Sequence, residues 1–279
     1  MKTCVVVEGG ALRGIYAAGV LDALLEENIK IDAMIGVSMG ALVGINYLSK
    51  QPGRALRYNL KYCPNRNYIG ILSLLKTGDI ANKQFAYYDL PLRLDPFDYD
   101  AFAKSKTKFY CTVTNLESGK AEYIEIKDPY KQIEYIRAGA SMPAVSNIVK
   151  IKKKEYLDGG IADSIPVMKA IEMGYDKIIV ILTRPLGYRK SSSKLKFLSW
   201  KYGKYPKFKK TLEKRNSLYN ETLDIIKELE SNKEIFVIRP SRKVPIKRIE
   251  HNPKMVQAQY DLGVEDFQEK KTELYGYLG

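Results

Sequence analysis

Two glycine-containing turns lie within the first 48 residues, and each one joins a short apolar segment to a helical pattern. β-Branched and apolar residues predict two buried strands at 3–7 and 31–37. Apolar residues at helical spacing predict helices at 14–27 and 41–48. The turns between them are Glu8-Gly9-Gly10-Ala11-Leu12-Arg13-Gly14 and Gly36-Val37-Ser38-Met39-Gly40. If the two strands are parallel neighbours, both turns lie at one edge of the sheet.

The second turn has the form G-x-S-x-G. A sharp turn from a strand into a helix exposes the middle serine at the helix N-terminus, where the helix dipole stabilises a developing negative charge. The pattern therefore predicts that Ser38 is a nucleophile. The alternative is a tight turn in which Ser38 only caps the helix.

The glycines of the first turn need a separate explanation, because such turns commonly direct backbone N–H groups at an anion. One interpretation is an oxyanion hole, whose donors must lie beside the nucleophile. The other is a dinucleotide-binding turn of the form G-x-G-x-x-G. Ala11 replaces the second glycine of that pattern, and Asp32 opens the second strand instead of closing it. The nucleotide interpretation is therefore the weaker one.

A serine nucleophile needs a base, and the chain contains a single histidine, His251. The order Ser38, Asp158, His251 matches that of α/β-hydrolases. However, Pro253 and the basic residues before His251 predict a surface loop, and only one strand precedes the serine. Asp158 is the alternative base, because burial in an apolar pocket raises the pKa of a carboxyl group. The non-catalytic alternative is that Asp158 only forms an Asx-turn, since Asp-Gly is a common turn dipeptide.

Charge and composition indicate the class of partner. The net charge of +14 favours anionic partners. Residues 184–215 hold twelve Lys and Arg, one acid (Glu213) and several aromatic residues, including Trp200. This segment predicts docking on an anionic membrane surface. A solvated face with inward-facing aromatics stays open as an alternative, and single-stranded nucleic acid is the less favoured partner.

Three cysteines without a spacing motif favour a reducing compartment, and the N-terminus has no signal-peptide pattern. We therefore expect a cytoplasmic protein that contacts membranes peripherally. No Cys/His cluster has metal-ligand spacing, so no metal is expected.

The same motifs, in the same order, resemble those of the patatin-like phospholipases. The two turns and Asp158-Gly159-Gly160 carry the resemblance, and three further blocks extend it to the bacterial branch of the family. These blocks are Asp95-Pro96-Phe97-Asp98-Tyr99, Ala138-Gly139-Ala140-Ser141-Met142-Pro143 and Leu157-Asp158-Gly159-Gly160-Ile161. The resemblance implies a lipid acyl hydrolase of the phospholipase A or lysophospholipase kind. It would use a Ser38–Asp158 dyad and need no histidine and no cofactor.

The resemblance also assigns the oxyanion hole to Gly9, Gly10 and Ala11. It implies supporting positions around these groups: Arg13, Gly14, Gly36, Met39, Gly40, Gly159 and Gly160. The family commonly has a third glycine where this chain has Ala11. Alanine keeps its N–H group, so the donor survives if the φ angle at Ala11 is negative.

Alternating strand and helix patterns predict a three-layer α/β fold, in which helices flank a central, mostly parallel sheet. We expect one patatin-like domain over residues 1–279, with its core at about 5–167 and a terminal helix at 253–277 interrupted by Gly263. Apolar and aromatic residues at 68–99 predict either plain core or a cap that lines an acyl-chain pocket. The expected function is lipid acyl ester hydrolysis. The alternatives are a nucleotide- or nucleic-acid-binding protein without hydrolase activity and a Ser-His-Asp hydrolase that uses His251.

Overall fold

The computed structural model describes residues 1–191 and 199–279. Within these ranges, eight strands form one sheet in the order β5-β6-β3-β2-β1-β7-β8, and β4 pairs with β3. The strands are β1 (Thr3–Val7), β2 (Ala33–Val37), β3 (Lys108–Asn115), β4 (Ala121–Glu125), β5 (Val149–Ile151), β6 (Lys154–Asp158), β7 (Lys177–Ile181) and β8 (Phe236–Ile238). The pairs among β8, β7, β1, β2 and β3 are parallel, whereas β4, β5 and β6 pair antiparallel. The sheet is therefore mixed, with a parallel centre.

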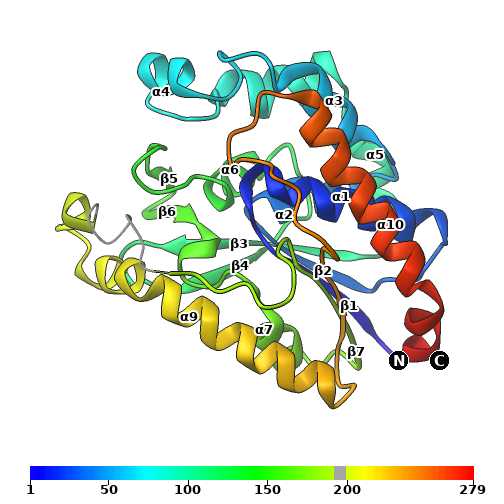
Figure 1. The fold of residues 1–279 in the computed structure, drawn as a ribbon. Coiled ribbons are helices and arrows are strands. Elements are labelled where there is room, and N and C mark those ends of the chain that lie inside the picture. Colours follow the sequence, from blue (N-terminus) through cyan, green and yellow to red (C-terminus); the bar gives the residue numbers. More distant parts are fainter. Residues whose placement is uncertain (192–198) are drawn as a thin grey trace.

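Helices cover both faces of the sheet, as predicted (Figure 1). They are α1 (Ile15–Glu26), α2 (Met39–Leu48), α3 (Arg54–Tyr62), α4 (Ile71–Thr77), α5 (Tyr99–Lys104), α6 (Ile133–Gly139), α7 (Val167–Glu172), α9 (Pro206–Ser231) and α10 (Pro253–Leu278). Short 3₁₀-helices are η1 (Ala11–Gly14), η3 (Gly159–Ile161) and η4 (Ser199–Tyr202), and η2 (Phe85–Leu94) is a π-helix. No helix in the described ranges is both long and apolar enough to cross a bilayer.

Side chains of the central strand β1 alternate between two cores, because successive residues of a strand point to opposite faces. Val5 and Val7 pack in the larger core with residues of α1, α2, α3 and α10. Cys4 and Val6 pack in the second core with residues of α7 and α9. Helices thus cover β1, the strand that carries the first turn, on both of its faces.

Helix α10 runs without interruption through Gly263, so the predicted break at this residue is wrong. The glycine serves a helix crossing instead. A Cβ atom added at Gly263 would lie 2.1 Å from the carbonyl oxygen of Tyr16 in α1, and one added at Gly19 would lie 2.2 Å from that of Tyr260 in α10. These two glycines let the backbones of α1 and α10 approach closely.

Helix α9 begins at Pro206 and ends at Ser231, so its first turns lie within the basic segment 184–215. Phe208, Leu212, Tyr219 and Ile226 are its buried residues and follow helical spacing. Of the other aromatics in residues 184–215, Tyr202 is buried, whereas Trp200 is 66% exposed. Most of the described aromatics in this segment therefore pack inward. Lys194, Lys196 and Phe197 lie outside the described residues.

Candidate active site

Ser38 lies in the turn between β2 and α2, as the sequence predicts. Its φ of 53° and ψ of −124° are strained for a residue with a side chain, and such strain gathers at functional sites. The hydroxyl group does not cap α2, so the capping interpretation is wrong. Gly36 and Gly40 let the turn close, because added Cβ atoms would lie 2.6 Å from Ala41 Cα and 2.5 Å from the Val7 carbonyl oxygen.

Asp158 is the last residue of β6, and its carboxylate meets Ser38 directly. The Ser38 hydroxyl donates to Asp158 Oδ2 at 2.6 Å. The N–H of Gly160 donates to Oδ1 at 2.7 Å, so the Asp-Gly turn and the contact with serine coexist on one carboxylate. Gly159 is required for close packing here, since an added Cβ atom would lie 2.3 Å from the carbonyl oxygen of Thr112.

Burial raises the pKa of the Asp158 carboxyl group, because the charged form is desolvated. The hydrogen bonds from Ser38 and Gly160 and the positive charges of Arg215 and Lys190 lower the pKa and so oppose this effect. Burial makes the Asp158 carboxylate a stronger base, and the hydrogen bonds hold it in place beside the Ser38 hydroxyl group. It is therefore suited to accept the proton of that hydroxyl group.

The first turn packs against the second. A Cβ atom added at Gly9 would lie 2.8 Å from Ser38 Cβ, and one added at Gly14 would lie 2.8 Å from Met39 Cγ. Gly10 likewise abuts the side chain of Thr183. The two turns therefore lie side by side at the C-terminal edge of β1 and β2, as the strand order requires.

Ala11 has a φ of +51°, so the condition that φ be negative is not met, although its backbone N–H group is still present. This left-handed conformation is one that glycine adopts without strain. Within the described residues, the backbone N–H groups of Gly10, Ala11 and Met39 make no hydrogen bond. These three donors remain free for a ligand near Ser38.

Glu8 and Arg13 flank the glycines and have different environments. The Glu8 carboxylate is buried and accepts from the Thr183 N–H at 2.6 Å and from the Tyr219 hydroxyl at 2.7 Å. The Arg13 carbonyl accepts from Gln259 of α10, whereas its Nε is buried with no partner in the described residues. Burial, and then the charges of other arginines, lower the pKa of Arg13 to about 10.

Sequence reasoning missed Lys190 and Arg215, because it counted them as part of a surface segment. Both residues line a pocket with Ser38 and Asp158. Arg215 Nε donates to the Gly160 carbonyl oxygen at 2.7 Å. The clue in the sequence was spacing: Arg215 falls on the same face of α9 as Leu212 and Tyr219.

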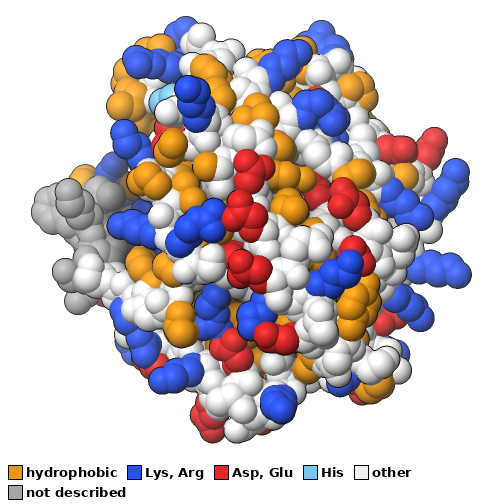
Figure 2. Space-filling view, turned by 45° about the vertical axis from the view of Figure 1, so that its right-hand side comes forward, with side chains coloured by type: hydrophobic (Ala, Val, Ile, Leu, Met, Phe, Trp, Pro, Cys, Tyr) orange, Lys and Arg blue, Asp and Glu red, His pale blue; other side chains and the backbone are white. Residues whose placement is uncertain are grey.

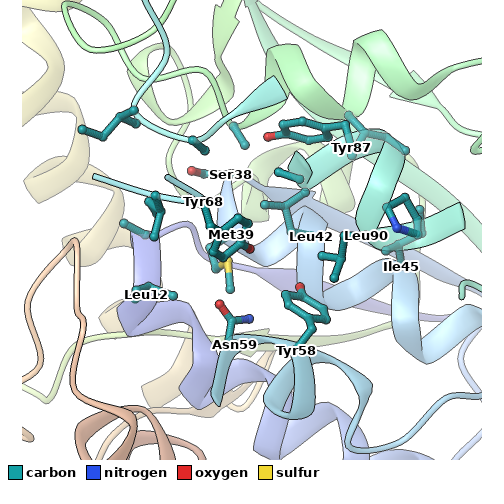
Figure 3. A pocket seen from close by; sticks show the side chains of 18 of the residues that line it. Leu12, Ser38, Met39, Leu42, Ile45, Tyr58, Asn59, Tyr68, Tyr87 and Leu90 are labelled. Atoms are coloured by element: carbon teal, nitrogen blue, oxygen red, sulfur yellow. The ribbon is translucent and has the colours of Figure 1, made fainter. Parts of the chain in front are cut away.

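Ser38 lies at the rim of an apolar pocket of about 150 Å³ (Figure 3). Figure 3 shows Leu12, Met39 and Leu42 around this space. The predicted cap contributes to the pocket walls through Tyr68, Ile69, Ile80, Ala81, Ala86, Tyr87, Leu90, Pro91, Phe97 and Tyr99. The cap interpretation of residues 68–99 therefore describes these side chains better than plain core does.

The residues required by the two alternative functions lie elsewhere. His251 Nδ1 is 2.6 Å from the Cys63 carbonyl oxygen, and the hydroxyl of Ser38 bonds to Asp158 instead. Asp32 accepts from the N–H of Thr3 at 2.8 Å, at the start of β1. It thus lies at the opposite end of the strand from the first turn, where it cannot reach a ligand held by that turn.

Comparison with known proteins divides the chain into two matched segments. Residues 5–171 match the family described as Patatin-like phospholipase, and residues 205–279 match a domain of unknown function, DUF6363. Tyr219 and Arg215 come from the second segment. The surroundings of Glu8 and Asp158 thus draw on both segments.

Curated relatives match about two thirds of the chain. The uncharacterized protein YjjU of Escherichia coli (strain K12) is 28% identical over 66% of this chain and 52% of its own length. Lysophospholipase NTE1 of Coccidioides immitis is 25% identical over 63% of this chain and 11% of its own length. Lysophospholipase nte1 of Aspergillus niger is 27% identical over the same shares. The chain thus spans about half of the bacterial relative and about a tenth of the fungal ones.

A solved structure, that of VipD from Legionella pneumophila, aligns with 96% of this chain and 66% of its own at a TM-score of 0.46 and 13% identity. The family match covers more than half of the chain and includes both turns and Asp158. The chain belongs to the patatin-like phospholipase family.

Proposed function

We propose that this chain is a lipid acyl hydrolase in which Ser38 is the nucleophile and Asp158 is the general base. The hydrogen bond of 2.6 Å between their side chains, at the rim of the apolar pocket, is the observation that carries the proposal. Membership of the family and the similarity to lysophospholipases support a lipid ester as the substrate.

The reaction follows from the positions of these groups. Ser38 Oγ attacks the ester carbonyl carbon while its proton passes to Asp158 Oδ2. The free N–H groups of Gly10, Ala11 and Met39 stabilise the oxyanion that forms. The intermediate then collapses, the alcohol leaves with the proton from Asp158, and an acyl-enzyme remains. Water, deprotonated by Asp158, attacks the acyl-enzyme and releases the fatty acid and the serine hydroxyl group.

The test is labelling by a fluorophosphonate reagent together with the release of fatty acid from a lipid panel. Ser38→Ala should abolish both, and Asp158→Asn should lower the rate by roughly 10²–10⁴, as is typical for loss of a general base. Ser217→Ala is the matched control. Ser217 is exposed on α9, and its hydroxyl group donates to the carbonyl oxygen of Lys214 and not to a carboxylate. Full activity in Ser38→Ala would refute the mechanism, and a protein that only binds nucleotides or nucleic acid would not react with the reagent.

We further propose that the chain acts as one domain, because β7, β8, α9 and α10 complete the sheet and both cores. Docking on anionic membranes through residues 184–215 also remains a proposal. Figure 2 shows Lys and Arg spread over one face with Asp and Glu between them, so that face has no purely basic stripe. Among the described aromatics of this segment, Trp200 is the exposed one and could enter the headgroup region.

The docking test replaces four lysines with Gln: Lys194, Lys196, Lys201 and Lys204. Binding to anionic vesicles should weaken in this variant, and for the wild type it should weaken as salt rises. Hydrolysis of a short soluble ester should change little. Unchanged vesicle binding would establish that the segment is simply a solvated face.

A further inference from the structure

A second pocket of about 260 Å³ shares Ser38 and Arg248 with the apolar pocket, and its walls combine apolar residues with several basic ones. Besides Asp158 and the glycine turn, its walls carry five cationic side chains, which we call the cationic cluster: Arg13, Arg184, Lys190, Arg215 and Arg248. Four separate parts of the chain supply these residues. They are the turn after β1, the segment after β7, helix α9 and the loop before α10.

No carboxylate neutralises the cationic cluster. Within residues 1–191 and 199–279, none of the five side chains forms an ion pair. The seven residues between these ranges contain no Asp or Glu. Elsewhere buried arginines are paired: Arg54 with Asp95, and Arg137 with Glu134.

The two carboxylates that do line this pocket are already engaged. Glu8 accepts three hydrogen bonds, two from Thr183 and one from Tyr219. Asp158 accepts from Ser38 and Gly160. The cationic cluster therefore outnumbers the acidic groups that line the same pocket, and four of its five members are partly buried, whereas Arg248 is exposed.

Burial and mutual repulsion lower the pKa values of Lys190 and Arg215. Burial, followed by the charge of Arg215, lowers the pKa of Lys190 to about 6, and Lys190 Nζ lies 3.3 Å from the centre of the Tyr219 ring. Burial and the charge of Arg248 also lower the pKa of Arg215. A bound anion would relieve this repulsion and restore the proton to Lys190.

We infer that the cationic cluster binds the phosphate of an anionic lipid headgroup while Ser38 attacks the ester. This inference rests on the proposed function. Ser38 lies where the two pockets meet, so an ester carbonyl at Ser38 places the acyl chain in the apolar pocket and the alcohol part in the cationic one. A phosphomonoester carries about −1.5 to −2 charges at pH 7 and three acceptor oxygens, which suit arginine forks. A quaternary ammonium headgroup would be repelled.

The first test compares substrates that differ only in headgroup: phosphatidic acid and phosphatidylcholine with identical acyl chains, in micelles of a neutral detergent. We expect wild-type kcat/KM to favour phosphatidic acid at least tenfold. The double variant Lys190→Gln/Arg248→Gln should lower this preference at least tenfold. Because the preference is a ratio of kcat/KM values for the two lipids, any effect of Lys190 on the reactivity of Asp158 that is the same for both lipids cancels.

The matched control is Lys214→Gln/Lys247→Gln. It likewise replaces two basic side chains, at exposed positions adjacent in sequence to Arg215 and Arg248. This variant should keep the wild-type preference. If both double variants lower the preference equally, attraction by overall charge explains it and the inference is wrong. It is also wrong if wild-type enzyme hydrolyses both lipids equally well.

The second test uses inorganic phosphate and the Ser38→Ala variant, in which the cationic cluster is intact but turnover is absent. We expect calorimetry to detect phosphate binding that Lys190→Gln/Arg248→Gln abolishes and Lys214→Gln/Lys247→Gln does not. Phosphate binding without any headgroup preference would assign the site to a free anion and overturn the headgroup inference. If the wild type hydrolyses no ester, the proposed function fails, and with it the inference that rests on it, while phosphate binding still reports whether the cationic cluster holds an anion.

Discussion

The crossing of α1 and α10 gives the sharpest quantitative prediction. In Gly263→Ala, the new methyl group would lie 2.1 Å from the Tyr16 carbonyl oxygen, whereas ordinary contact begins near 3.4 Å. The obstacle is backbone, so the helices must separate by roughly 1 Å along their length, at a cost of about 3 kcal/mol. The better helix propensity of alanine returns about 1 kcal/mol. The free energy of unfolding should therefore fall by about 2 kcal/mol.

Urea denaturation followed by circular dichroism measures this change, and the chain supplies its own control. Gly276 lies in the same helix with no atom within 4 Å of an added Cβ atom, so Gly276→Ala should leave stability unchanged or raise it by up to about 1 kcal/mol. Gly19→Ala, on the partner helix, should reproduce the loss. If Gly263→Ala and Gly276→Ala shift the urea midpoint equally, the close crossing is wrong.

Three further predictions concern the site and its supports. His251→Ala should keep most esterase activity while Asp158→Asn loses it, and the reverse pattern in the same assay would establish a Ser-His-Asp triad. Ala11→Gly should be active and at least as thermostable as the wild type, because glycine adopts the observed φ of +51° without strain; a marked fall in the melting temperature would contradict that geometry. Burial raises the pKa of Asp22 to about 6, so the folded state holds this proton at a pH where the unfolded chain, with a pKa near ~3.9, has lost it. Stability should therefore fall as pH rises from about 4 to about 6, and Asp22→Asn should flatten that slope in urea titrations at a series of pH values.

Local patterns predicted the parts of the site that depend on neighbouring residues. The strand–turn–helix units around Ala11 and Ser38 follow from spacing within a few residues, and the position of Asp158 at a strand end follows in the same way. The backbone angle at Ala11 was not predictable, because alanine allows both signs of φ and the packing of the turn selects one.

Features that depend on distant contacts escaped prediction. Gly263 looked like a helix breaker, because nothing near it in sequence indicates that Tyr16 lies against it. Lys190 and Arg215 were assigned to a basic surface, since composition counts charges without giving their direction. The direction of a charged side chain becomes known only when the positions of the surrounding helices and strands are known.

The order of strands in the sheet has a consequence for how the chain acquires its structure during synthesis. β1 leaves the ribosome long before β7, which is one of its two neighbours, and Val5 pairs with Ile179. Such non-local pairings slow folding, because a long loop must close before the contacts form. The segment matched to the family, 5–171, ends before β7 begins. A fragment limited to it would expose an apolar strand edge to self-association, and we expect it to be degraded in a pulse-proteolysis experiment that the whole chain survives.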